Sequence, residues 1–236
     1  MFDRIAKQKL NVILMVDCST SMRGKRMDQV NNALKDIQKH LIELQGENSN
    51  VDFYISVITF GTTADYLNDD KAKNIVDFEF NDIVAKGWSN LHLAFEKLEV
   101  LLEKESKGGI MPDFGGIAPI IILLTDGHPT GKEYLEKLAK LKEKPWFNIA
   151  LKYGIAIELN DERTIKVLRE FVGVNGDVIQ VYDSNLLQKI IKIIVITASK
   201  VKSKSLSVHS QKRVSVTREL QQEIQNAINE VEDWEW

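Results

Sequence analysis

Two short segments of the sequence place oxygen-bearing side chains directly after an apolar run. Asp17-Cys18-Ser19-Thr20-Ser21 follows the run Val12–Val16 and offers one carboxylate and two hydroxyls on alternate residues. Further along the chain, the run Ile120–Leu124 leads into Thr125-Asp126-Gly127. Short apolar runs of this kind are typical of buried strands. We therefore expect each aspartate to lie at the end of a strand.

These side chains have the chemistry of a divalent-cation site. Magnesium, manganese and calcium prefer hard oxygen ligands, which carboxylates and hydroxyls supply. Ser89, just before a segment with helical periodicity, adds one more hydroxyl. Only two of the five groups are charged, so the ion would stay electrophilic enough to take an Asp or Glu of a partner as its last ligand. The predicted ligands are Asp17, Ser19, Ser21, Ser89 and Asp126.

Each of these residues alone also has an ordinary structural interpretation. Ser and Asp are favoured at helix N-caps, which would account for the Asp17–Ser21 segment and for Ser89. The segment Thr125-Asp126-Gly127-His128-Pro129 has the composition of a turn. Their occurrence together, at corresponding places of one α/β topology, favours the metal site.

The rest of the sequence alternates between strand and helix patterns. Helical spacing runs from Met27 to Leu44 and is followed by Gly46, and Val51–Phe60 is rich in β-branched and aromatic residues. The other expected elements are an edge strand at Ile75–Phe80, a helix at Leu91–Leu102, a helix around Glu133–Lys142, a strand at Phe147–Ile157, a helix around Glu162–Val172, a strand at Val178–Tyr182 and a helix from about Ser184 to Ser199.

Apolar strands that alternate with helices predict an α/β fold. We expect a Rossmann-like, doubly wound and mostly parallel sheet with one antiparallel edge strand and a C-terminal helical tail. In such sheets, ligands bind at the carboxyl ends of the strands where the strand order reverses. Asp17 and Asp126 are both expected at such ends.

The composition narrows the class of protein. A chain of 236 residues can form one α/β domain with a short appendage, and its net charge of −3 argues against a nucleic-acid surface. The single cysteine, Cys18, excludes an internal disulfide and fits a reducing compartment. The longest apolar stretches have about half the length of a membrane span, and the start of the sequence lacks the pattern of a secretory signal. We expect a cytoplasmic protein.

The composition changes near residue 200, which we predict as the boundary between a domain at 1–199 and a tail at 200–236. The tail begins with a basic, serine-rich linker and continues with an amphipathic helix. It closes on an acidic end that contains Trp234 and Trp236. Such a helix could dock on a partner or pack on its own domain, and the sequence leaves both open.

The motifs of residues 8–199 resemble those of the von Willebrand factor A domain. That family's metal-ion-dependent adhesion site (MIDAS) combines an Asp-x-Ser-x-Ser loop, a Thr from a second loop and an Asp from a third. Here the second loop is similar to Gly87-Trp88-Ser89-Asn90-Leu91, with Ser89 where threonine is usual and Trp88 where glycine is common. Val57–Gly61 also looks like the family's second strand and its exit.

The resemblance implies a function. It implies a non-enzymatic protein-interaction module that binds Mg²⁺, or Mn²⁺ or Ca²⁺, and takes an Asp or Glu from its protein partner. The turn Thr125–Thr130 is most similar to the bacterial branch linked to tellurium resistance. That branch implies a scaffold in stress response or phage defence, beside a Ser/Thr protein kinase and a metal-dependent phosphatase.

An enzyme is the alternative. A phosphohydrolase of the haloacid-dehalogenase type would use Asp17 as its nucleophile, but it needs an acid two residues on, where this chain has Ser19. Trp88 and His128 flank the predicted site and are candidate partner contacts, as are Trp234 and Trp236 in the tail. A solvated turn residue is the plainer interpretation of His128.

Overall fold

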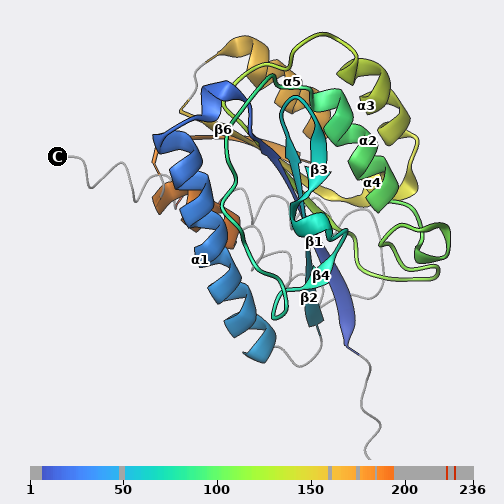
Figure 1. Cartoon of the computed structure of the whole chain (residues 1–236). Helices are drawn as coiled ribbons and strands as arrows, with labels where there is room; N and C mark the ends of the chain where they lie inside the picture. The colour runs from blue at the N-terminus through green and yellow to red at the C-terminus, as the bar shows by residue number, and fades with distance from the viewer. Residues whose placement is uncertain are drawn as a thin grey trace, which may run out of the picture.

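The computed structural model describes residues 7–47, 51–158, 161–173, 176–183 and 185–193, together with Gln222 and Asn226. These residues form one seven-stranded sheet in the order β3-β2-β1-β5-β6-β7, with β4 paired to β2 (Figure 1). The five parallel strands are β1 (Gln8–Asp17), β2 (Val51–Phe60), β5 (Ile120–Thr125), β6 (Leu151–Ile157) and β7 (Gly176–Val181). The short strands β3 (Ala64–Tyr66) and β4 (Lys73–Asn74) run antiparallel to β2.

Helices cover both faces of the sheet. One face packs against α1 (Lys25–Glu47) and the helical residues 185–193. The opposite face packs against the others, which are α2 (Leu91–Leu101), α3 (Tyr134–Lys142), α4 (Pro145–Ile149) and α5 (Glu162–Val172). In Figure 1, β1 runs upward and α1 returns downward, so the chain reverses at the carboxyl end of β1. The doubly wound α/β class predicted from the sequence is confirmed.

The central strand β1 supplies side chains to both cores. Leu14 and Val16 face the α1 side, whereas Ile13 and Met15 face α2. All four are fully buried. A strand buried on both faces reads as a continuous apolar run rather than an alternating one, as the sequence of β1 does. Burial of each such side chain stabilises the fold by about 1.5–3 kcal/mol, so the strand that ends in Asp17 is rigidly held.

The predicted edge strand at Ile75–Phe80 is wrong. The antiparallel edge is formed by β3 and β4 instead, and 75–80 is an irregular segment. Its alternation has another cause: Ile75 and Phe78 point into the core, and Phe80 packs edge-to-face on Phe78 with ring centroids 4.7 Å apart. The Gln38 side chain of α1 donates to the carbonyls of Ile75 and Phe78, and the Ile75 N–H donates to the Phe53 carbonyl of β2 at 2.9 Å. The segment therefore bonds to both α1 and β2 without forming a strand.

The predicted strand at Phe147–Ile157 is half wrong. Its first residues belong to α4, and β6 begins only at Leu151. Pro145 occupies the first turn of α4, a position that suits proline because its missing N–H is not needed there. Phe147 is buried against Phe171, so its apolar character reflects packing of a short helix. The helix at Glu162–Val172 and the strand at Val51–Phe60 are confirmed at their bounds.

The predicted helix at Ser184–Ser199 is helical at 185–193, and its remainder lies outside the described residues. The same is true of the boundary at residue 200, the linker, Trp234 and Trp236. Gln222 and Asn226 are helical and exposed. Within the described ranges, none of the helices combines the length and the apolar character that a membrane crossing requires.

Candidate metal centre

Asp17 and Thr125 end two neighbouring parallel strands. The register pairs Val16 of β1 with Leu124 of β5, so the next residues of both strands emerge at one edge of the sheet. The strand order also reverses here, because β2 lies on one side of β1 and β5 on the other. This is where an open α/β sheet binds its ligands. The position predicted from the sequence is therefore the one that the fold provides.

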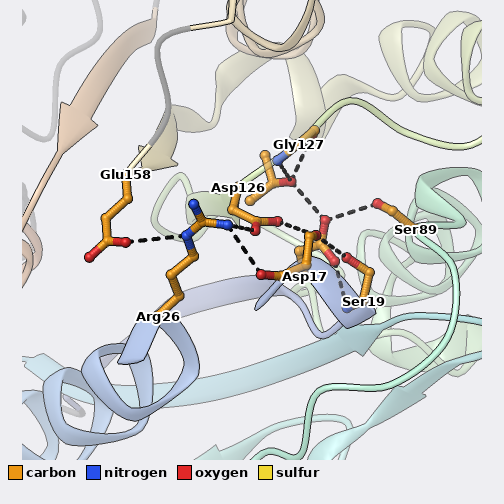
Figure 2. A network of polar contacts seen from close by, with 9 residues as sticks. Asp17, Ser19, Arg26, Ser89, Asp126, Gly127 and Glu158 are labelled. Atoms are coloured by element: carbon orange, nitrogen blue, oxygen red, sulfur yellow. Dashed lines mark hydrogen bonds and ion pairs between the residues drawn. The ribbon is translucent and has the colours of Figure 1, made fainter. Parts of the chain in front are cut away.

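The Asp17 carboxylate is completely buried and accepts three hydrogen bonds. Its Oδ1 accepts from the Ser19 backbone N–H at 2.8 Å. Its Oδ2 accepts from Ser89 Oγ at 2.9 Å and from Thr125 Oγ1 at 2.7 Å (Figure 2). Burial raises the pKa of Asp17, and the hydrogen bonds from Ser19, Thr125 and Ser89 offset part of that rise. Because the hydrogen-bond donors around this buried carboxylate are neutral, a positive charge bound nearby would stabilise its ionised form.

The other predicted ligands adjoin this carboxylate. Ser19 Oγ lies 3.0 Å from Ser21 Oγ, and Ser21 Oγ donates to Asp126 Oδ1 at 2.7 Å. The 3-10 helix η1 (Thr20–Met22) turns the chain so that the two serines face one another. Asp126, directly after β5, is 3% exposed. The structure thus brings all five predicted residues into one hydrogen-bonded group.

The loop that carries Ser89 is fixed by close backbone contacts. The Gly87 carbonyl accepts from Thr20 N and from Thr20 Oγ1, both at 3.0 Å. Gly87 has φ +81°, and a Cβ there would lie 2.0 Å from Thr62 Oγ1. On the other side, the Ser89 carbonyl accepts from Thr130 N at 2.8 Å. These bonds tie the Ser89 loop to both aspartate loops.

The donor set fits a divalent cation. It consists of two carboxylates and three hydroxyls, and the hydroxyl hydrogens can rotate away to leave oxygens facing an ion. Among the described residues, no Lys, Arg or His forms an ion pair with Asp17. An isolated buried carboxylate is costly unless a cation compensates it, and a bound ion would do so. Within the same ranges, no three His, Cys, Asp or Glu side chains gather as a metal-binding group.

Two charged residues that were not predicted from the sequence, Arg26 and Glu158, lie beside this group. Arg26, in the first turn of α1, donates from Nη1 to Asp126 Oδ2 at 2.7 Å and from Nε to Glu158 Oε2 at 3.3 Å. Glu158 follows β6, so the rule that located Asp126 at a strand end could also have located it. Burial raises the pKa of Glu158, but hydrogen bonds from Arg26, Lys25 and Gln29 outweigh it and the net pKa is lowered.

The two predicted partner contacts in the described residues are both exposed. Trp88, next to Ser89, is 68% exposed, and His128, two residues after Asp126, is also exposed. Asp17, by contrast, is 0% exposed and its oxygens are occupied by three donors. A nucleophile must reach its substrate, so this geometry disfavours the phosphohydrolase alternative.

The sheet order and the Asp-x-Ser-x-Ser loop at the carboxyl end of β1 define a Rossmann-like α/β domain. The sequence matches the von Willebrand factor type A domain over residues 11–193, and the chain belongs to that family. Domains of this family are typically non-catalytic and mediate protein–protein interactions. The family predicted from the motifs is confirmed.

Relatives share parts of this chain. Human inter-alpha-trypsin inhibitor heavy chain H6 is 30% identical over 131 residues, which are 51% of this chain and 9% of that protein. One similar structure is that of proximal thread matrix protein 1 from the mussel byssus, with a zinc-occupied MIDAS motif. Its TM-score is 0.52 at 18% identity, and the match covers 82% of this chain and 48% of the mussel chain. The pilus adhesin SpaC from Lactobacillus rhamnosus GG, in its open conformation, has a TM-score of 0.52 at 12% identity. That match covers 93% of this chain and 30% of the SpaC chain. The chain thus spans less than half of each of these relatives, and the two structures share its fold.

Proposed function

We propose that this chain is a divalent-metal-dependent protein-interaction module. Mg²⁺ or Mn²⁺ is the proposed ion, with Ca²⁺ as the third candidate. The observation that carries the proposal is the buried Asp17 carboxylate, which accepts three hydrogen bonds and has no cationic side chain paired with it in the described residues. The proposed ligands are Asp17, Ser19, Ser21, Ser89 and Asp126.

The ion would supply a Lewis-acidic position for a carboxylate of the partner. Only two of the five proposed ligands are charged, so the ion would stay electrophilic enough to bind a third carboxylate, from the partner. Trp88 is suited to contact the partner, because a large aromatic side chain that is 68% exposed beside a polar site is typical of binding hot spots. The zinc-occupied MIDAS of the mussel protein supports a metal at the corresponding place.

The narrower assignment is to a bacterial stress-response or phage-defence scaffold. In that setting the partners would be a Ser/Thr protein kinase and a metal-dependent phosphatase of the tellurium-resistance type. This part of the proposal rests on the turn Thr125–Thr130, whose Thr-Asp-Gly-x-Pro-Thr pattern is similar to that branch. Identification of a captured partner tests it directly.

The proposal is tested in two stages: the first measures metal binding, and the second measures partner binding. Titration calorimetry of the full chain with MgCl₂, MnCl₂ and CaCl₂ should show one site in the wild type and none in Asp17→Ala. The matched control is Asp52→Ala, which removes an aspartate from the amino end of β2, at the opposite edge of the sheet. That variant should bind metal as the wild type does.

Capture from native lysate then tests the interaction. A partner retained by the wild type with Mg²⁺, and lost with chelator or with Asp17→Ala, supports the module. Retention that is equal in all of these conditions would contradict it, because the contact would then lie away from the ion.

A further inference from the structure

Arg26 and Asp126 form an ion pair inside the proposed metal site. The shortest distance, from Nη1 to Oδ2, is 2.7 Å, and the Asp126 side chain is fully buried while that of Arg26 is 31% exposed. The same Nη1 lies 3.2 Å from the Ser21 carbonyl oxygen. From the first turn of α1, the guanidinium therefore contacts both loops that carry the proposed ligands Ser21 and Asp126 (Figure 2).

Both oxygens of Asp126 are occupied in this arrangement. Oδ1 accepts from Ser21 Oγ, and Oδ2 accepts from Arg26. A divalent ion that used Asp126 would share this carboxylate with a fixed positive charge. Two cations on one carboxylate repel each other, and the repulsion is screened less at a buried carboxylate such as Asp126 than at the surface.

Glu158 gives the guanidinium a second acceptor on the side away from Asp17. In Figure 2, Arg26 lies between Glu158 and Asp126, and its Nε donates to Glu158 Oε2 at 3.3 Å. Glu158 has φ 48°, a left-handed backbone conformation that residues other than glycine rarely adopt. Gln29 also donates to it, at 3.2 Å to Oε1, which holds the carboxylate toward α1.

We propose that Arg26 is a built-in counter-ion of Asp126 that competes with the divalent cation, so that it sets how tightly the chain binds metal. Glu158 retains the guanidinium when the cation takes Asp126. The inference rests on the proposed metal site and names the residue that tunes it. A purely structural Arg26 would have the opposite effect on affinity, because its loss would loosen the loops that hold the ligands.

The test is calorimetric titration of the full chain with MnCl₂ and MgCl₂. Arg26→Gln should bind metal on the order of tenfold more tightly than the wild type, because a positive charge next to a ligand is removed. Its thermal midpoint without metal should fall, since Asp126 is then buried without a positively charged partner. Arg26→Lys keeps the charge and should bind metal about as weakly as the wild type.

Lys25→Gln is the matched control. Lys25 precedes Arg26 and has the same charge, but its side chain is 76% exposed and pairs with Glu158 at 3.4 Å. It should leave the metal affinity within about twofold of the wild type, because an exposed charge is screened by solvent. Equal tightening in Lys25→Gln and Arg26→Gln would overturn the proposal, since only net charge would then matter.

Glu158→Gln should act in the reverse direction and only through Arg26. It leaves the guanidinium on Asp126 and should weaken metal binding, but its effect should largely vanish in the background of Arg26→Gln. A double-mutant cycle measures this coupling. A Glu158→Gln effect that is as large in the Arg26→Gln background as in the wild type would overturn the role given to Glu158.

The outcomes separate this inference from the metal site itself. Metal binding by the wild type with equal or weaker binding by Arg26→Gln overturns the inference and leaves the site standing. Binding by Arg26→Gln with none detectable in the wild type supports both. No binding by either chain overturns both.

Discussion

Thr125 Oγ1 donates to Asp17 Oδ2 at 2.7 Å and joins the ends of β5 and β1 across 108 residues of chain. The same hydroxyl accepts from the Gly127 backbone N–H at 3.2 Å, and it lies 3.0 Å from the Gly127 carbonyl oxygen. Thr125 therefore fixes both the carboxylate of the first loop and the turn that carries Asp126. It is not among the ligands that the sequence predicts, and its function is to position them.

Thr125→Val keeps the shape of this side chain and removes its hydroxyl. We expect a loss of about 1–3 kcal/mol in the free energy of unfolding, because a buried hydrogen bond to a charged group is lost. Metal affinity should fall roughly tenfold or more, as it does when groups that orient metal ligands are removed. Chemical denaturation and calorimetry measure the two effects. Thr59→Val in β2 is the control, and an equal loss of metal affinity there would contradict the argument.

Asp17→Asn should separate stability from metal binding. The folded pKa of Asp17 is raised by burial, so its contribution to stability is largest below about pH 4 and is lost as pH rises through the folded pKa. At neutral pH the variant no longer buries that charge. Without metal we expect it to melt at a higher temperature than the wild type, and the difference should shrink as the pH is lowered.

In excess Mg²⁺, the wild type should instead melt at a higher temperature than Asp17→Asn. Metal stabilises only a chain that binds it, by an amount that grows with the logarithm of its concentration. The wild type should then gain stability while Asp17→Asn does not. Thermal melts at pH 7 with chelator and with saturating MgCl₂ make the comparison. A variant that is less stable than the wild type in chelator would show that burial of this charge is fully compensated within the protein.

The positions of the two aspartates could be predicted from the sequence because they depend on local patterns and one topological rule. A run such as Val12–Val16 predicts a buried strand, and parallel strands place their carboxyl ends at one edge. Glu158 also follows a strand, β6, so the same rule would have placed it at this edge. Arg26 carries no such signal, because its contacts with Asp126 and Glu158 depend on how α1 crosses the end of β6. The irregular segment at 75–80 was mistaken for a strand for a related reason, since alternation reports burial and does not report which partner the backbone bonds to.

Gly87 should be essential to the site for steric reasons. Gly87→Ala places a methyl group 2.0 Å from Thr62 Oγ1 and also meets the left-handed φ of +81°, so either Thr62 or the Ser89 loop must shift. Because the Trp88 N–H bonds to the Thr62 hydroxyl, a shift of Thr62 also disturbs this loop. Gly108→Ala is a matched control, because Gly108 has φ +83° but nothing within 4 Å of its added Cβ. Both variants should lose roughly 1–2 kcal/mol to backbone strain, but only Gly87→Ala should also lose metal affinity. Equal metal binding by the two would contradict a positioning role for this loop.

Cys18 should be chemically inert although it lies between Asp17 and Ser19, two of the proposed metal ligands. It packs against the core on the α1 side. Burial, and after it the adjacent Asp17 carboxylate, raise the pKa of the thiol to about 11. The thiolate is the reactive form, so about a thousandth of the thiol is reactive at pH 8. Alkylation by iodoacetamide at that pH should therefore be roughly a hundredfold slower in the folded protein than in urea, as mass spectrometry can measure. Rates that match in the two conditions would show an accessible thiolate and contradict this prediction.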